Sequence, residues 1–301
     1  MTSIDSTRYY RRVDGVVSPE LHQRHILQVG CGAGSDSALK LARLGPKRLT
    51  LVDCDVVEVE NLCRTAFTVD DLGRPKVEAL AHHIGQANPL VEVRTLHRDI
   101  LELSEHEVAA LLEGVDLIIA GTDSFAAQAR LNLWAMQYRI PAVFIGIHER
   151  ARGGLVTWVL PGETPCYRCV ARSRYEAAES GWDGELNLAG ARGSAIDVAF
   201  IDAVALKLCL AILERGEDSD AGCFLGDAGG RNQVVARTDP HYRWGDVDLF
   251  DLVLSDLPKS PRPYKTELKR QVFFALDTLW LESDYLPDCP DCALLGEKRD
   301  G

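Results

Sequence analysis

The chain has 301 residues, of which 46% are hydrophobic, and its formal net charge is −12. A chain of this size can bury a large core, and its excess of acidic residues disfavours non-specific binding to nucleic acid or to an anionic membrane. It has neither an apolar run long enough for a transmembrane helix nor the apolar core of a signal peptide, so we expect a cytoplasmic protein.

Strand and helix patterns alternate along the first half of the chain. Short apolar runs predict strands at residues 25–30, 48–53, 91–96, 116–120, 142–145 and 155–160. Helical spacing predicts helices at 35–44 and 76–87, and further helices are expected between the earlier strands. This alternation predicts an α/β fold with a mainly parallel, Rossmann-like sheet and helices on both faces. A helix at 194–215 and a strand at 233–237 follow, and the proline-rich residues 239–264 are expected to run over the surface.

A glycine-rich loop lies between the first predicted strand and helix. Its glycines, Gly30, Gly32 and Gly34, let backbone amides approach a phosphate, and the helix N-terminus adds partial positive charge. Asp53 ends the second strand, where a carboxylate typically binds ribose hydroxyls. The loop indicates a nucleotide, but it also suits an S-adenosylmethionine-dependent methyltransferase, a dinucleotide enzyme or a tight turn without ligand.

Polar and cationic side chains follow the second strand. Asn61, Arg64 and Lys76 come after it, close to the expected position of the glycine loop. An enzyme that handles a triphosphate needs such groups around the leaving pyrophosphate, whereas S-adenosylmethionine carries no phosphate. Asp123 follows another strand and therefore lies at the edge of the sheet where ligands bind, as a candidate Mg²⁺ ligand. Each of these residues alone is weak evidence for a triphosphate site. The inference rests on their order and spacing taken together.

Six motifs occur in a fixed order: VGCGAG, LTLVDCD, VEVENLCR, GRPK, LIIAGTDS and GGLVTWVLPGETPCYRCV. From about residue 8 to about residue 212, and again at the terminal CxxC, the sequence resembles the ThiF/MoeB/HesA family, which has the fold of ubiquitin-activating enzymes. The resemblance implies an adenylyltransferase that uses ATP and Mg²⁺ to activate the C-terminal glycine of a ubiquitin-like or sulfur-carrier protein. It implies that Asp53 binds the ribose, that Asn61, Arg64 and Lys76 bind the phosphates, and that Asp123 holds Mg²⁺.

The resemblance also implies a homodimer with shared sites. The segment RYYRR is similar to the family's RYxRQ, so Arg11 matches the arginine that reaches the partner subunit's ATP, with Arg8 and Arg12 as competing candidates. Three departures stand out: the glycine loop is one residue shorter, Ser124 replaces an expected Asn, and about 239–285 is an insertion without counterpart. We expect one domain over 1–301, with a nucleotide-binding half at 1–160 and a zinc and crossover half at 161–301.

Two CxxC pairs, Cys166 with Cys169 and Cys289 with Cys292, lie far apart in the chain. Because cytosolic cysteines are mostly reduced, clustered pairs indicate metal ligands. Four thiolates fit a closed tetrahedral Zn²⁺ site, which is structural because it leaves no open position for substrate. The resemblance implies the same zinc, which would clip the C-terminal tail onto the sheet. A redox CxxC or coincidental thiols are the alternatives.

Five further cysteines bear on whether a thioester intermediate forms. Family members that transfer their adenylate to a thiol use a cysteine in the crossover segment after the first zinc pair, and residues 170–208 contain none. Either no thioester forms or Cys223, in a glycine-rich context, is the candidate nucleophile. Cys209 is expected in the core, and Cys31, Cys54 and Cys63 are expected to pack near the nucleotide. His148 is expected to be structural, and His82 and His83 to be ordinary helix residues.

The expected reaction is attack of an already ionised carboxylate on the α-phosphate of ATP, followed by transfer to a sulfur carrier, a conjugating enzyme's cysteine or an amine. The same chemistry on a peptide or a tRNA base is one alternative. A methyltransferase is another, but it leaves the zinc cysteines unexplained. An inactive scaffold is the third, and the presence of Arg11, Arg64, Lys76 and Asp123 argues against it. We favour a conjugation-type partner.

Overall fold

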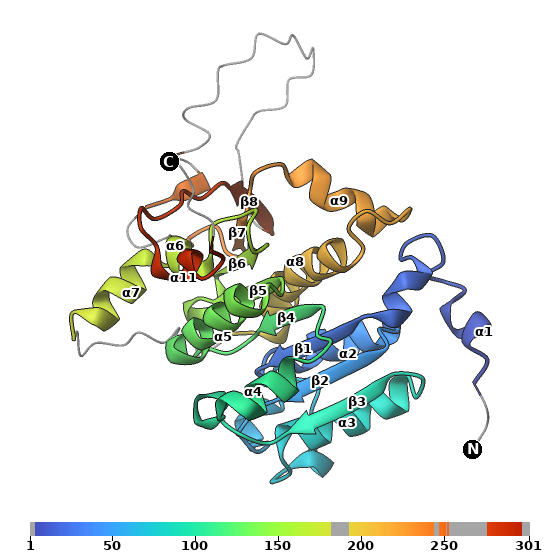
Figure 1. Cartoon of the computed structure of the whole chain (residues 1–301). Coiled ribbons are helices and arrows are strands. Elements are labelled where there is room, and N and C mark those ends of the chain that lie inside the picture. Colours follow the sequence, from blue (N-terminus) through green and yellow to red (C-terminus); the bar gives the residue numbers. More distant parts are fainter. Residues whose placement is uncertain (1–3, 182–192, 244–246, 251, 253–275, 297–301) are drawn as a thin grey trace, which may run out of the picture.

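The computed structural model describes residues 4–181, 193–243, 247–250, 252 and 276–296 (Figure 1). The centre of this described part is an eight-stranded sheet in the order β3-β2-β1-β4-β5-β6-β7-β8. The strands are β1 (His25–Val29), β2 (Arg48–Val52), β3 (Glu92–Leu96), β4 (Leu117–Ala120), β5 (Ala142–Ile147), β6 (Gly153–Val159), β7 (Gln233–Arg237) and β8 (Asp277–Leu281).

The sheet has a parallel half and an antiparallel half. Strands β1 to β5 pair in parallel, as the alternation of strands and helices predicts. From β5 onward the pairing is antiparallel. The reason lies in the connections, because only residues 148–152 join β5 to β6, and a parallel crossover needs about a dozen residues or more. The fold is therefore α/β and Rossmann-like in its first half, and it continues into antiparallel strands.

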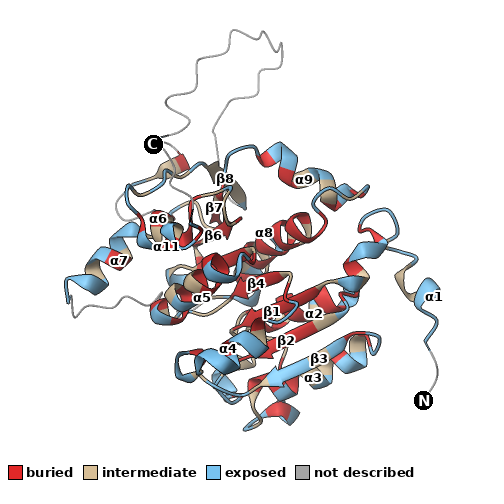
Figure 2. Cartoon of the chain, in the orientation of Figure 1, coloured by how far each residue is buried: buried red, intermediate tan, exposed pale blue. Residues whose placement is uncertain are grey.

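Helices cover both faces of the sheet, and its central strands are buried, whereas the edge strand β3 is largely exposed (Figure 2). Successive residues of β1 point to opposite cores, with Ile26 on one face and Leu27 on the other. The first face carries α2 (Ser35–Leu44), α3 (Lys76–Ala87), α8 (Ala195–Leu213) and α9 (Asp220–Ala228). The second face carries α4 (Glu105–Leu112), α5 (Phe125–Tyr138), α6 (Tyr167–Val170), α7 (Arg172–Glu179) and α11 (Pro290–Ala293).

Short elements complete the described chain. The helix α1 (Ser6–Tyr10) lies at the edge, where the Tyr9 hydroxyl donates a hydrogen bond of 2.7 Å to the carbonyl of Ala87. Single 3₁₀ turns are η1 (Pro19–Gln23), η2 (Val59–Asn61), η3 (Val69–Asp71), η4 (Ile100–Glu102) and η5 (Glu149–Ala151). Within the described ranges we find no helix with the length and apolarity that a membrane span requires.

The structure extends the sequence predictions in the second half. The helix expected at 194–215 is α8, and the strand expected at 233–237 is β7. The strand β8 was not predicted, and it lies inside the segment 239–285 that the sequence analysis treats as an insertion. Most of the proline-rich stretch expected to run over the surface, at 239–264, lies outside the described residues.

Candidate functional site

A cavity of about 350 Å³ opens at the carboxyl-terminal edge of the parallel strands. This is the edge at which ligands bind in open α/β sheets. Its wall includes all the nucleotide-binding and magnesium candidates of the sequence analysis except Arg11: Gly30, Gly32, Gly34, Asp53, Asn61, Arg64, Lys76 and Asp123. Segments that follow three different strands, β1, β2 and β4, thus meet around one space.

The glycine loop is held by hydrogen bonds from a buried side chain and packs closely against the loop that contains Gly121. Gly30 has a positive φ of 95°, and a Cβ atom there would lie only 2.4 Å from the carbonyl oxygen of Gly121. The buried Gln28 side chain donates hydrogen bonds to the carbonyls of Gly30 and Gly34, at 3.1 and 2.8 Å. Gly32 faces Lys76, since a Cβ there would lie 3.9 Å from Lys76 Nζ. The shortened loop therefore still has a defined shape.

Asp53 links this loop to the end of β2. Its carboxylate accepts hydrogen bonds from the backbone N–H of Cys31 at 2.6 Å and of Asp55 at 2.9 Å. Burial raises the pKa of Asp53, and the two amide hydrogen bonds oppose that rise. Burial alone would lower the pKa of Lys76, but its 2.7 Å ion pair with Asp55 and the charge of Asp53 raise it. The positively charged side chain of Lys76 is therefore held in the cavity beside the glycine loop.

The remaining predicted residues come from turns at the cavity's rim. Asn61 closes η2, where its Oδ1 accepts the backbone N–H of Glu58 at 2.9 Å and its carbonyl accepts that of Arg64 at 3.1 Å. Asp123 is exposed and immediately precedes α5, whose first turn is capped by Ser124 through the Ala127 N–H at 3.3 Å. Ser124, found where the resemblance predicts Asn, therefore serves as an N-cap.

Arg11 is the predicted residue that the structure does not bring to the cavity of its own chain. It is exposed at the end of α1, beside a separate hollow that includes Tyr10 and His22. Arg8 and Arg12 are exposed as well. Arg11 therefore does not line the candidate nucleotide cavity of its own chain.

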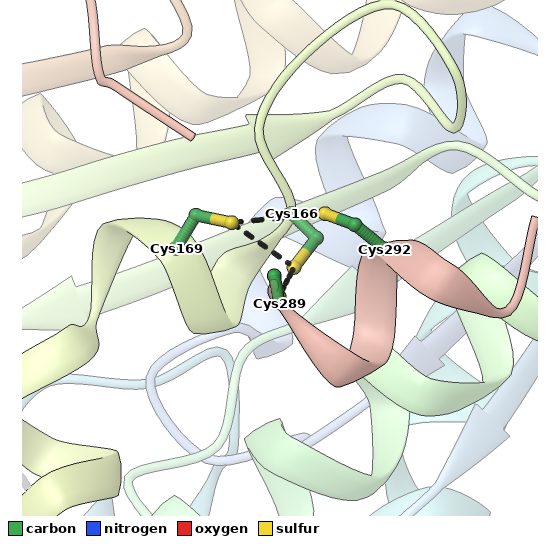
Figure 3. Close-up of side chains that lie close together, drawn as sticks. All are labelled: Cys166, Cys169, Cys289 and Cys292. Carbon is green, nitrogen blue, oxygen red and sulfur yellow. Dashed lines mark hydrogen bonds between the residues drawn. The ribbon is translucent and has the colours of Figure 1, made fainter. Parts of the chain in front are cut away.

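The four cysteines of the two CxxC pairs converge in one cluster (Figure 3). Cys166 Sγ lies 3.8 Å from Cys169 Sγ and 3.6 Å from Cys289 Sγ, and Cys169 Sγ lies 3.6 Å from Cys292 Sγ. Zn–S bonds of about 2.3 Å in a tetrahedron place sulfurs about 3.8 Å apart, so the spacing fits zinc. Hydrogen bonding to Cys166 lowers the pKa of Cys169 to about 7 and lowers that of Cys289 as well.

The other cysteines divide into buried and exposed ones. Cys31 and Cys209 are buried, and burial raises the pKa of both thiols. Cys54 and Cys63, which are expected to pack near the nucleotide, are both exposed in the segment after β2. Cys54 nevertheless borders the cavity. Cys223 is exposed on α9 and is not part of the cavity wall.

Sequence reasoning missed several residues around the cavity. Arg98 and Asp99 follow β3, and Asp202 comes from α8. An acidic residue within the apolar run IDVAFIDAVALKLCL was the available signal for Asp202. His148, expected to be structural, shares a 2.6 Å hydrogen bond between its Nδ1 and the Tyr242 hydroxyl, and burial lowers its pKa to about 4.

Comparison with known proteins places this architecture in a family. The sequence model of the ThiF family matches residues 11–197. Ubiquitin-like modifier-activating enzyme 5 of Aedes aegypti is 31% identical over 183 residues, which are 56% of this chain and 46% of that protein. Its namesake in Dictyostelium discoideum is 30% identical over 183 residues, 56% of this chain and 48% of that protein. The chain thus spans about half the length of these curated relatives.

Solved structures show the same fold at lower identity. E. coli MccB with MccA superposes with a TM-score of 0.62 at 16% identity, over 96% of this chain and 75% of that chain. PaaA superposes with a TM-score of 0.59 at 21% identity, over 81% of this chain and 83% of that chain. Since the family's sequence model covers more than half of the residues, the chain belongs to the ThiF family.

Proposed function

We propose that this chain uses ATP to adenylylate a carboxylate, namely the C-terminal glycine of a ubiquitin-like or sulfur-carrier protein. The observation that carries the proposal is the single cavity, which gathers the glycine loop, Asp53, Arg64, Lys76 and Asp123 in a ThiF-family chain. The relatives named ubiquitin-like modifier-activating enzyme 5 support the substrate class.

In this proposal each part of the cavity wall has one task. Asp53 binds the ribose, while Asn61, Arg64 and Lys76 bind the phosphates and stabilise charge on the leaving pyrophosphate. Arg11 acts on the cavity of a second copy, which makes the active enzyme a homodimer. Its exposure and its distance from the cavity wall in its own chain agree with such a role.

Asp123, Thr122 and Ser124 all line the cavity, and carboxylate and hydroxyl oxygens are ligands that suit Mg²⁺. When bound, Mg²⁺ neutralises negative charge on the phosphates. The substrate carboxylate is ionised at neutral pH, so no residue has to remove a proton before it attacks. A new bond forms between its oxygen and the α-phosphorus, and the bond to the pyrophosphate oxygen breaks. The cationic side chains stabilise the negative charge that develops on the departing pyrophosphate.

The zinc cluster has a structural role in this proposal. Cys166, Cys169, Cys289 and Cys292 supply four thiolates, which is a closed set. We propose one domain over 1–301, with a nucleotide-binding half (1–160) and a zinc and crossover half (161–301), and within the second half this cluster ties residues 289–292 to the start of α6. The adenylate then passes to a sulfur carrier or to a conjugating enzyme, and Cys223 is the candidate for any thioester on this chain because it is exposed.

ATP–pyrophosphate exchange tests the proposal. It is measured with Mg²⁺ against a panel of ubiquitin-like proteins, each with its native and its truncated C-terminus. Exchange that needs the intact tail, disappears in Asp123→Ala and persists in Asp227→Ala, a matched change at an exposed position on α9, would support it. ATP binding without exchange on any ubiquitin-like protein would shift the substrate to a peptide or RNA. Binding of S-adenosylmethionine instead of ATP would overturn it.

A further inference from the structure

Gln128 is a buried polar side chain in the first turn of α5, with an exposure of 0%. Its Nε2 donates a hydrogen bond of 2.8 Å to the backbone carbonyl of Thr122. Its Oε1 accepts two hydrogen bonds of 2.8 Å, one from the Tyr167 hydroxyl and one from Arg174 Nη1. An amide is costly to bury without such partners, so these contacts hold the side chain in one place.

The chemistry of the partners fixes which way the Gln128 amide faces. A guanidinium carries only donors, so the amide atom that faces Arg174 must be its oxygen. The Tyr167 hydroxyl accepts a hydrogen bond of 2.7 Å from Arg174, which leaves its own proton for Gln128 Oε1. Burial raises the pKa of Tyr167, against the opposing charge of Arg174, so this proton stays in place at neutral pH. The Gln128 N–H is therefore directed at the Thr122 carbonyl.

The Thr122 carbonyl connects this buried group to the cavity. It belongs to the same planar peptide unit as the backbone nitrogen and Cα of Asp123, so the hydrogen bond from Gln128 holds that plane. The next peptide unit is held as well, because the backbone N–H of Ser124 donates a hydrogen bond of 3.2 Å to Thr122 Oγ1. Both peptide planes that flank Asp123 are thus fixed, while Asp123 itself is exposed and lines the cavity.

Gln128 acts on the cavity without touching what the cavity binds. It is not among the described residues that line the cavity, and its burial leaves no surface for a ligand to contact. We propose that Gln128 is a positioning residue, which holds Asp123, through the Thr122 carbonyl, in the orientation in which Asp123 serves as a Mg²⁺ ligand. This assignment rests on the proposed function and adds to it the group that orients one metal ligand. Metal affinity falls when the hydrogen bonds that orient a ligand are removed.

Two substitutions separate the donor of Gln128 from its acceptor. Gln128→Glu has nearly the same shape and keeps oxygen acceptors for Tyr167 and Arg174, but its carboxylate offers no N–H to the Thr122 carbonyl. Gln128→Met removes every polar atom and adds no charge. Gln137→Glu, at an exposed position on the same helix, is the matched control for the added charge.

Metal affinity is measured directly, on the enzyme with α,β-methylene ATP, whose α–β linkage cannot be broken. Mn²⁺ replaces Mg²⁺ because it takes the same oxygen ligands, and the free ion is quantified from its electron paramagnetic resonance spectrum. We expect the Kd for Mn²⁺ to rise about fivefold or more in both Gln128 variants and to stay within about twofold in Gln137→Glu. The Kd for the nucleotide without metal should stay within about twofold in Gln128→Glu, because no group that contacts the nucleotide is altered.

Exchange kinetics and a double substitution supply the second half of the test. The Mg²⁺ concentration for half-maximal ATP–pyrophosphate exchange should rise in both Gln128 variants by about the same factor as the Mn²⁺ Kd. In an Asp123→Ala background, Gln128→Glu should have no further effect on the Mn²⁺ Kd, as expected when one residue acts through the other. Effects of the two substitutions that simply multiply would overturn the assignment.

Stability separates this role from a merely structural one. Gln128→Glu should lower the thermal midpoint less than Gln128→Met, because it keeps the contacts with Tyr167 and Arg174. A lower midpoint with an unchanged Mn²⁺ Kd would show a structural role and overturn the proposal, and so would an equal loss of affinity for the nucleotide without metal.

The outcomes also distinguish this assignment from the proposed function. Mn²⁺ affinity that is unchanged in Asp123→Ala would remove the metal-binding role of Asp123 and this assignment together. A loss of affinity in Asp123→Ala alone, with both Gln128 variants equal to the unsubstituted enzyme, would remove this assignment only. Absence of exchange on the whole panel would remove the proposed substrate class, whereas the Mn²⁺ titration needs no protein substrate and still decides the role of Gln128.

Discussion

The side-chain amide of Asn132 donates a hydrogen bond of 2.7 Å to Asp291, joining α5 to α11. The same side chain accepts the backbone N–H of Tyr167 at 2.9 Å. Since α6 carries Cys169 and α11 carries Cys292, one buried residue holds both short helices of the cysteine cluster. Burial raises the pKa of Asp291, and the hydrogen bond from Asn132 opposes this rise.

Replacing Asn132 should therefore weaken the whole C-terminal attachment. We expect Asn132→Ala to lower the free energy of unfolding by about 2–4 kcal/mol, because two buried groups lose their partners. Urea denaturation at neutral pH measures this difference. Gln137→Ala, at an exposed position on the same helix, should change stability by less than about 0.5 kcal/mol. Equal stability of the two variants would show that the contact is dispensable.

The cysteine cluster predicts a bound metal. We expect purified protein to hold about one zinc ion per chain, and Cys292→Ser to lose most of it together with several degrees of thermal midpoint. Elemental analysis and thermal melting measure the two effects. Cys223→Ser, which changes an exposed thiol outside the cluster, should keep both zinc and midpoint. Full zinc content in Cys292→Ser would contradict the four-cysteine assignment.

Substitutions at two glycines distinguish the stability cost of backbone strain from that of steric contact. Gly30 and Gly73 both have positive φ, but a Cβ at Gly30 meets Gly121 whereas one at Gly73 meets nothing within 4 Å. Gly73→Ala should cost roughly 1–2 kcal/mol of unfolding free energy, from φ alone, and Gly30→Ala clearly more. Gly85→Ala, in open space inside α3, should instead stabilise the protein by up to about 1 kcal/mol. Denaturant titrations of the three variants give the comparison, and equal losses at Gly30 and Gly73 would refute it.

Lys76 should contribute mainly to catalysis. We expect Lys76→Met to lower kcat/KM for ATP–pyrophosphate exchange by roughly 10²–10³-fold, because a buried cation aimed at developing charge is lost. Exchange kinetics on the substrate found with the panel measure the effect. Lys40→Met removes an exposed lysine that pairs with Asp36 on α2, and it should leave the kinetics unchanged. Comparable kinetics for the two variants would exclude a phosphate-binding role for Lys76.

His148 makes folding sensitive to mild acid. Its pKa is lowered to about 4 by burial, whereas an unfolded histidine has its ordinary value of 6.5. Between these values only the unfolded chain binds the proton, so stability is greatest above pH 6.5 and falls as the pH drops toward 4. The loss from this residue should reach roughly 2–3 kcal/mol near pH 4.5. His148→Gln should show a flatter profile in urea denaturation from pH 7.5 to 4.5, and parallel profiles would contradict the prediction.

The parallel half of the fold could be predicted because its signals are local. Apolar runs, glycines and proline stops lie within each element, and they locate β1, α2, β2 and α3 to within a residue or two. The cysteine cluster was predictable for a different reason, since paired CxxC motifs carry their chemistry in the residue type. The spacing of Asn61, Arg64, Lys76 and Asp123 likewise anticipated which residues meet in one cavity.

The rest depended on contacts distant in sequence. The strand β8 is half-buried and, within the described part of the chain, lies at the edge of the sheet beside β7, so its own residues carry little pattern. Asp202 becomes notable only when α8 is laid against the cavity, and Cys54 and Cys63 appear exposed only once the turns after β2 are traced. The role proposed for Arg11 depends on a second chain, which no pattern within one sequence can place.

The contact between Gly30 and Gly121 makes the floor of the cavity a single unit. Because the two loops touch backbone to backbone, neither can move toward a ligand without displacing the other. Much of the entropic cost of ordering these two loops is therefore incurred when the chain folds. A ligand then binds to backbone amides that are already in position. A ligand that does not match the shape of this floor would then be excluded because the two loops cannot rearrange separately, without the need for any repulsive side chain.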